Sequence, residues 1–250
     1  MKRAAWLGTA VSLVGGVALW WGVALRAGPL LLPTPAAVAA VLWSDRARLT
    51  AALAETAFGA LGGLALATTL GVVAAGVGWA SRGWAAAVRP WAVLVQVVPI
   101  VAIAPILVVW LGYGRPVALA TAAIAAFYPV YSATITGLGA AGQDQVDLVR
   151  LLGASRAQEL LVLRAWAALP AVFSGLRTAA GLAVIGAIVG EFVGSNGSPP
   201  TLGHTVLYAS RSARLEQAFA AIVLAGALAL ALGLCLSWAE RRLIARWYGA

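Results

Sequence analysis

The sequence predicts an all-α membrane protein with about six transmembrane helices. Of its 250 residues, 62% are hydrophobic and only 10% are charged, and the mean hydropathy is +0.94. Soluble domains are roughly 45–50% apolar and about 25% charged, so this chain lacks the polar side chains to cover its surface in water. The length of its uncharged stretches also matches the roughly 20 helical residues that are needed to cross a bilayer. A soluble globular domain is therefore excluded.

Six stretches account for the expected crossings. Five of them contain no charged residue and cover residues 6–25, 56–80, 91–114, 116–143 and 217–239. The sixth covers residues 171–194 and carries Arg177 near one end and Glu191 near the other. The first stretch is longer than a signal-peptide core of roughly 7–15 residues and lacks a small-residue cleavage site, so we interpret it as a membrane helix. We expect a single transmembrane domain over residues 1–250.

The basic residues indicate the orientation of the chain. There are 17 Lys and Arg residues against 8 acidic ones, which gives a formal net charge of +9. If both termini are cytoplasmic, 11 basic residues fall on the cytoplasmic side and 6 fall outside, as the positive-inside rule requires. The cytoplasmic residues include Arg82 and Arg89, which we expect in a loop between the second and third stretches. These residues lie between apolar stretches rather than in one basic patch, so we interpret them as topology signals and expect no nucleic-acid partner.

The connection after the first stretch predicts an amphipathic helix on the outer surface, over residues 34–50. Thr34 can cap this helix and Pro35 suits its first position. Trp43 is expected to anchor the segment at the outer membrane interface. Its apolar residues recur at helical spacing, at Val38, Val41, Leu42 and Leu49.

A second connection, over residues 140–170, is polar enough to face the cytoplasm. Its apolar positions predict two short helices that meet at Gly153, where glycine can adopt a left-handed conformation. Ser155 can cap the second helix. Such a hairpin presents an apolar and charged surface that suits the docking of a soluble partner.

The residues of this hairpin resemble the EAA loop of bacterial ABC-importer permeases, and in particular the nitrate, sulfonate, taurine and bicarbonate branch. The loop begins with Asp147 where the family usually has glutamate, and Leu148 and Val149 stand where it tends to have alanines. Trp166 replaces a proline common in the family. The matching segments are residues 32–36, 98–114, 127–131, 147–156, 168–170, 173–177 and 186–192.

The resemblance implies a type I ABC-importer permease in the bacterial cytoplasmic (inner) membrane. Such a permease pairs with a second copy, here expected as a homodimer, and receives a small anionic solute from an extracytoplasmic substrate-binding protein. Two cytoplasmic ATPase subunits bind ATP and Mg and dock on the EAA loop. The resemblance thus assigns ATPase coupling to Asp147, Arg150, Gly153, Ala154, Ser155 and Arg156.

This chain itself is expected to be non-catalytic and to bind no cofactor. It has no Gly-x-x-x-x-Gly-Lys phosphate loop, and Lys2 is its sole lysine. His204 is its sole histidine, and the nearest serines lie six and nine residues before it in a Gly/Pro-rich loop rather than on a separate helix that would fix a nucleophile, so we expect a loop histidine near the outer surface. No cluster of histidine, cysteine and carboxylate residues has metal-ligand spacing, so no metal site is expected.

Polar residues and prolines inside the expected spans are candidates for the translocation path. Each has an alternative role in packing, because hydroxyl groups bond to helix carbonyls and proline is common in membrane helices. A buried carboxylate in a membrane points to function, and for Glu191 we expect a structural or gating role near the outer interface. The candidate residues are Gln96, Pro99, Pro105, Tyr128, Tyr131 and Glu191.

Three other classes of protein compete with this interpretation. A self-contained secondary transporter would show internal repeats or buried charge pairs, and neither is evident in the sequence. A membrane enzyme would require a set of catalytic residues. A non-transporting assembly protein would have little use for a glycine-bent cytoplasmic hairpin.

Overall fold

The computed structural model describes residues 2–29, 31–196 and 199–248. Within this part of the chain the secondary structure is helical throughout, with no strand. In chain order the elements are α1 (Lys2–Ala27), α2 (Pro35–Ser44), α3 (Arg46–Ala80), α4 (Arg82–Val97), α5 (Ile100–Leu111), α6 (Arg115–Leu138), α7 (Gln143–Leu151), α8 (Arg156–Glu159), the π-helical segment η1 (Leu160–Arg164), α9 (Ala165–Gly194), α10 (Leu202–Arg211) and α11 (Leu215–Tyr248).

The membrane helices confirm the predicted all-α class. Four helical segments are long and apolar enough to cross a bilayer, namely α3, α6, the run from α8 to α9, and α11. A fifth crossing is formed if the bent pair of α4 and α5 counts as one span. The first predicted stretch lies within α1, of which Val11–Ala27 forms a shorter apolar helix.

The predicted span over residues 91–114 is not one straight helix. Its two halves, α4 and α5, meet at an angle of 102°. Pro99 precedes the first residue of α5, and Val98 before it is extended (φ −69°, ψ 125°), the conformation that a following proline favours. The expected loop around Arg82 and Arg89 is replaced by helix, because Ser81 alone separates α3 from α4 and caps α4 by accepting the Trp84 N–H at 3.4 Å.

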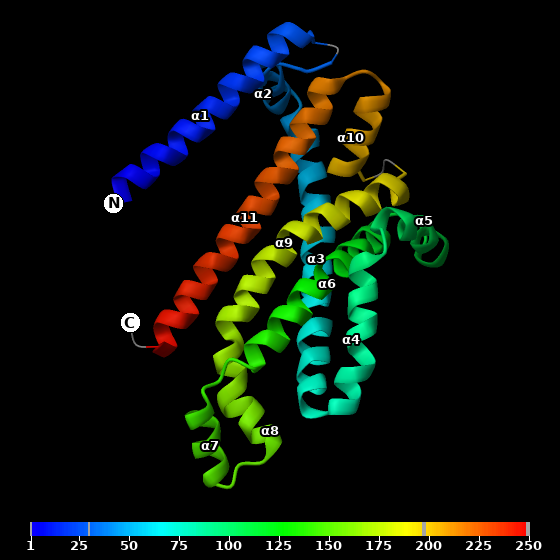
Figure 1. Cartoon of the computed structure of the whole chain (residues 1–250). Coiled ribbons are helices and arrows are strands. Elements are labelled where there is room, and N and C mark those ends of the chain that lie inside the picture. The colour runs from blue at the N-terminus through cyan, green and yellow to red at the C-terminus, as the bar shows by residue number, and fades with distance from the viewer. Residues whose placement is uncertain (1, 30, 197–198, 249–250) are drawn as a thin grey trace.

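The centre of the bundle is formed by α3, α6 and α9, which cross at close range (Figure 1). Small residues permit the approach. A Cβ added to Gly63 of α3 would lie 2.3 Å from the Ala122 Cβ of α6. One added to Gly175 of α9 would lie 2.4 Å from the Ala133 Cβ of α6. By contrast, Gly76 at the far end of α3 has no atom within 4 Å of such a Cβ.

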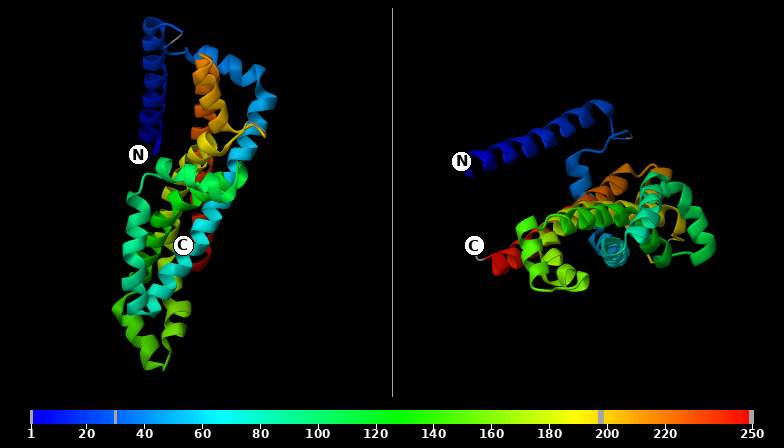
Figure 2. Two further views of the ribbon diagram at one scale, coloured as in Figure 1. Left: turned by 90° about the vertical axis from the view of Figure 1, so that its right-hand side faces the viewer. Right: turned by 60° about the horizontal axis from the view of Figure 1, so that its bottom comes forward.

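The two ends of the molecule differ in structure. The hairpin of α7 and α8 and the turn between α3 and α4 lie at one end, and α2 and α10 lie at the other (Figure 1). The C-terminal end of α1 and the N-terminal end of α11 lie at the α2 and α10 end, and the opposite ends of both helices point toward the hairpin side (Figure 1). Helix α1 stands apart from the bundle in the further views (Figure 2), and its Trp20 Nε1 donates to the Pro33 carbonyl at 3.1 Å.

The outer amphipathic segment forms as predicted in its first part. Thr34 caps α2 by accepting the Ala37 N–H at 3.2 Å, and Pro35 is the first helical residue. The helix ends at Ser44, so the rest of the predicted segment belongs to the first turn of α3. Trp43 is exposed, and the Arg46 guanidinium lies 4.9 Å from the centre of its ring.

Candidate functional site

The hairpin of α7 and α8 has the predicted glycine bend. Gly153 has a φ of +78°, in the left-handed region that favours glycine. No atom lies within 4 Å of a Cβ added there, so the backbone conformation, rather than space, requires glycine. Ser155 caps α8 in a reciprocal pair with Gln158: the Ser155 Oγ accepts the Gln158 N–H at 3.3 Å, and the Ser155 N–H donates to Gln158 Oε1 at 2.8 Å.

Most of the predicted coupling residues lie on the exposed surface of this hairpin. Asp147 and Arg156 are exposed, and Ala154 is half-buried beside the bend. Large apolar side chains are exposed around them, an arrangement typical of a protein–protein contact. We call this the hairpin surface; its apolar members are Leu148, Leu151, Leu152, Leu161 and Val162.

A buried carboxylate holds the hairpin together from within. The Glu159 side chain is only 3% exposed, and it accepts Arg150 Nε at 3.0 Å and Arg164 Nε at 2.7 Å. The hydrogen bond from Arg150 to this carboxylate raises the pKa of the Arg150 guanidinium above its usual value. Arg164 also donates to the Leu138 carbonyl at 2.8 Å, and its guanidinium lies 4.9 Å from the Trp79 ring centre. Glu159 thereby joins both hairpin helices to the end of α6.

The sequence carries only a weak signal for this cluster. Glu159 and Arg164 are five residues apart and would lie on different faces of a regular α-helix, which turns about 100° per residue. The π-helical segment η1 begins directly after Glu159 and ends at Arg164, and its wider turn brings residues five apart onto one face. Arg150 is nine residues before Glu159 and reaches it only because the chain folds back at Gly153.

Three adjoining cavities, which we call the polar hollow, lie between α4, α6 and α9. They have volumes of about 400, 350 and 550 Å³, and Tyr128 of α6 lines all three. Arg89 and Tyr131 line the first cavity, and Pro99 lines the second. The polar side chains lining the third cavity are Gln96, Tyr128, Ser132, Thr136, Ser174 and Thr178.

The predicted path residues are therefore brought together only in part. Four of them, Gln96, Pro99, Tyr128 and Tyr131, line the polar hollow. Pro105 is exposed on α5 and lines none of its cavities. The basic residue that sequence reasoning missed is Arg89, which was expected in a cytoplasmic loop.

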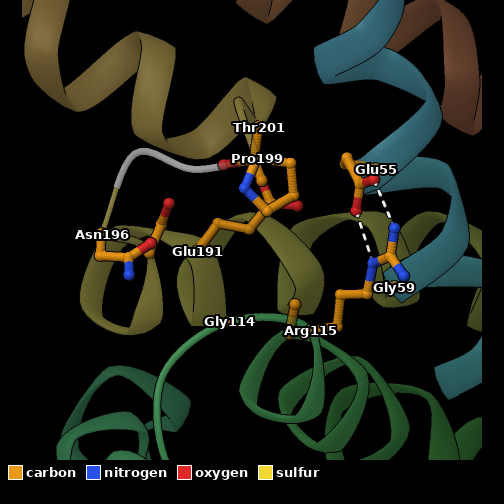
Figure 3. A pocket seen from close by; sticks show the side chains of 10 residues that line it. Glu55, Gly59, Gly114, Arg115, Glu191, Asn196, Pro199 and Thr201 are labelled. Carbon is orange, nitrogen blue, oxygen red and sulfur yellow. Dashed lines mark hydrogen bonds and ion pairs between the residues drawn. The ribbon is translucent and has the colours of Figure 1, made fainter.

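Glu191 is buried in a separate pocket near the α2 and α10 end of the molecule (Figure 3). The residue is only 4% exposed, so its side chain does not reach the surface, and the structural or gating role expected of it stays a prediction. Glu191 Oε2 accepts the Thr56 Oγ1 hydroxyl at 3.0 Å and the Gly203 N–H at 2.8 Å. Thr56 Oγ1 in turn accepts the Leu202 N–H at 3.0 Å. These bonds join α3 and α9 to the start of α10.

An ion pair borders the same pocket. Arg115 of α6 donates to both carboxylate oxygens of Glu55 of α3 at 2.6 and 2.7 Å (Figure 3). Its guanidinium lies 5.1 Å from the Phe58 ring centre. The pocket has a volume of about 20 Å³, enough for a single water molecule. We expect this outer pocket to hold helices together rather than to admit a solute.

Arg177 and His204 lie outside these sites. Arg177 does not pair with Glu191 but with Glu240 of α11. His204 lies in α10 rather than in a loop, and its ring stacks on Tyr208 at 6.1 Å. No group of three histidine, cysteine or carboxylate residues that could hold a metal ion occurs among the described residues.

Replacing Thr56 by valine is expected to loosen α10 at the α2 and α10 end of the bundle. Valine keeps the shape of threonine but leaves the buried Leu202 N–H without its acceptor and removes a donor to Glu191. A buried unsatisfied polar group costs about 1–3 kcal/mol. Faster hydrogen exchange at the start of α10, measured by mass spectrometry, would show this. Exposed Thr50, whose hydroxyl bonds only within its own helix, supplies the control Thr50→Val.

Comparisons with known proteins agree with this architecture. A sequence model of the family described as "Binding-protein-dependent transport system inner membrane component" matches residues 67–247. A "Probable ABC transporter permease protein" of Haemophilus influenzae is 32% identical over 93% of this chain and 95% of its own length. The riboflavin transport system permease protein RibX of Chloroflexus aurantiacus is 32% identical over 77% of this chain and 74% of its own length.

A more distant relative and a solved structure extend the comparison. The taurine transport system permease protein TauC of Escherichia coli is 28% identical over 92% of this chain and 86% of its own length. The crystal structure described as an amino acid ABC transporter with histidines has a TM-score of 0.65 at 14% identity. The superposed region covers 80% of this chain and 96% of the chain in that structure, so the two proteins share a fold.

Proposed function

This chain belongs to the family of binding-protein-dependent inner-membrane transport components, and on that premise we propose how its hairpin and polar hollow carry out transport. It is the permease subunit of an ATP-driven ABC importer for a small solute, and its family works with ATPase and substrate-binding partners. In our proposal the partner ATPase binds and hydrolyses ATP with Mg, and this chain supplies the path and the coupling element.

The observation that carries the proposal is the hairpin surface. Exposed leucines lie beside Asp147, Arg150 and Arg156 at the end of a membrane bundle, so this surface offers a soluble partner both apolar area and charge. The Glu159 cluster attaches the hairpin to the end of α6, and η1 continues directly into α9. Movement of a docked ATPase would therefore be transmitted to two helices that line the polar hollow.

The polar hollow is the proposed translocation path. It is lined by hydroxyl and amide side chains of α4, α6 and α9 in an otherwise apolar bundle. One chain surrounds it from only some sides, and we propose that a second copy of this chain completes the path as a homodimer. With Gln96, Pro99, Tyr128 and Tyr131 in this path, Glu191 takes the structural role of joining α10 to the bundle.

The proposed orientation places the hairpin in the cytoplasm and α2 and α10 at the outer face of a bacterial inner membrane. We propose that both termini are then cytoplasmic, because the free ends of α1 and α11 point toward the side of the hairpin (Figure 1). The substrate-binding protein would dock at the outer face. We propose a small anionic solute, supported by Arg89 in the hollow and by the taurine permease among the relatives; the riboflavin permease shows that the relatives differ in solute.

The test of this proposal is the recovery of an ATPase with the tagged permease from its native membrane. We expect Gly153→Val to lose most of the ATPase while inserting normally, because a β-branched residue is strained at a φ of +78° and no other contact is disturbed. Mass spectrometry of the purified complex measures the recovery.

The matched control is Gly142→Ala in the same connection. Gly142 has a φ of −62°, and an added Cβ would only touch the Gln145 side chain at 3.7 Å. This variant should retain the ATPase. Solute uptake by the purified chain without any ATPase would instead support a self-contained transporter and contradict the proposal.

A further inference from the structure

We propose that Arg89 and Tyr131 bind the anionic group of the solute in the cytoplasmic half of the path. The inference rests on the proposed function, because it assumes that the polar hollow conducts the solute. It assigns a binding step to two residues that line one cavity of about 400 Å³, within the size range of small-molecule pockets.

Tyr131 carries a hydroxyl group that has no hydrogen-bond partner among the described residues. The residue is only 3% exposed, and its ring stacks on Phe127 with the ring centres 5.8 Å apart. A Cβ added to Gly71 of α3 would lie 3.1 Å from the Tyr131 backbone nitrogen, so the surrounding helices hold this part of α6 closely. Buried hydroxyls are normally bonded, so the Tyr131 hydroxyl keeps a free donor for a ligand that displaces the atoms now covering it from the cavity.

Arg89 supplies the positive charge of the same cavity. It forms no ion pair among the described residues, whereas Arg115, Arg150, Arg164 and Arg177 are each paired with a carboxylate. None of the residues that line its cavity is acidic. Arg89 is exposed and lines this cavity from α4. An arginine in a membrane span typically marks an ion or substrate pathway, and its guanidinium matches a sulfonate or carboxylate.

The position of the pair suits a solute that is leaving the path. Tyr131 lies about two helical turns before Leu138, where α6 meets the hairpin. Tyr128 lines this cavity, the cavity at the bend of α4 and α5, and the third cavity between α6 and α9, so a solute moving between them remains in contact with one side chain. The hydroxyls of Ser132 and Thr136 also line the Arg89 cavity.

A lipid phosphate carries the same kind of charge as a sulfonate, so the test must separate the two sources. The purified permease is heated in dodecyl maltoside, and the fraction that stays monodisperse in size-exclusion chromatography gives its unfolding temperature. The probes are methanesulfonate, its uncharged analogue dimethyl sulfone, and phosphatidylglycerol, each added separately.

We expect methanesulfonate, but not dimethyl sulfone, to raise the unfolding temperature of the wild type. In Tyr131→Phe and Arg89→Gln the concentration needed for half of this response should increase at least tenfold, and Arg89→Lys should retain part of it. Without a probe, Tyr131→Phe should unfold at the same or a higher temperature than the wild type, because it loses only an unpartnered hydroxyl. If Tyr131 had only a structural role, its replacement by phenylalanine would not weaken the response to methanesulfonate while leaving the unfolding temperature without a probe unchanged or higher.

The controls Arg26→Gln and Tyr113→Phe alter an exposed arginine and an exposed tyrosine outside the polar hollow and should respond as the wild type does. An equal response of all variants, or none in the wild type, would overturn the proposal. An Arg89-dependent response to phosphatidylglycerol alone would assign the site to lipid and overturn it as well. ATPase recovery is measured separately, so failure here leaves the permease assignment intact.

Discussion

Glu159→Gln is expected to abolish ATP-driven uptake while the permease still inserts and folds. The glutamine amide carries no charge, so the Arg164 guanidinium, whose side chain is only 13% exposed, loses its carboxylate partner. Leaving a buried polar group unsatisfied costs about 1–3 kcal/mol, which is enough to loosen a short hairpin. Arg150 would be released at the same time, since both arginines bind the one carboxylate.

The measurement is uptake and ATP hydrolysis in proteoliposomes that contain the complete transporter. We expect hydrolysis to persist without uptake, because the hairpin surface remains on the chain while its attachment to α6 is weakened. Asp144→Asn removes an exposed carboxylate from the first turn of α7 and should leave uptake unchanged. Coupled uptake at the wild-type rate in Glu159→Gln would refute the role given to this cluster.

Gly63→Ala is expected to destabilise the whole bundle. The added Cβ would lie 2.3 Å from the Ala122 Cβ and 2.8 Å from the backbone nitrogen of Ala123, so α3 and α6 must separate. Inserting a methyl group into a close-packed contact costs about 1–3 kcal/mol. The expected result is a lower unfolding temperature and a lower yield of monodisperse protein.

The control for this prediction lies on the same helix. Gly76→Ala introduces the same methyl group where no atom lies within 4 Å, so its unfolding temperature should equal or exceed that of the wild type, because alanine has the higher helix propensity. Equal unfolding temperatures for the Gly63 and Gly76 variants would show that α3 and α6 can move apart without loss of stability.

Features with a local cause were predictable from the sequence. Thr34 before Pro35, Ser155 before a short helix and Gly153 at a bend all act through their own backbone neighbours, and the structure confirms each. The apolar runs also located the long helices, because length and hydropathy alone decide whether a helix can cross a membrane.

Features that depend on distant partners were not predictable. Glu191 is buried because Thr56 and Gly203 come to it from other helices, and nothing in its own neighbourhood reveals this. Glu55 and Arg115 are 60 residues apart along the chain, so their ion pair requires the packing of α3 on α6. A proline at position 99 indicates a bend, but its 102° angle is set by the elements on both sides.

The π-helical segment η1 also has a consequence for the direction in which the hairpin faces. One residue of an α-helix corresponds to a rotation of about 100°, and a π turn accommodates one residue more than an α turn. The segment from Leu160 to Arg164 therefore acts as a one-residue register shift between the hairpin and α9. If this turn tightened to a regular α-helix, α8 would rotate around the axis of α9. The hairpin surface would then face a different direction. If an ATPase docks on the hairpin surface, as we propose, the direction from which it approaches the membrane bundle depends on the number of residues in this single helical turn.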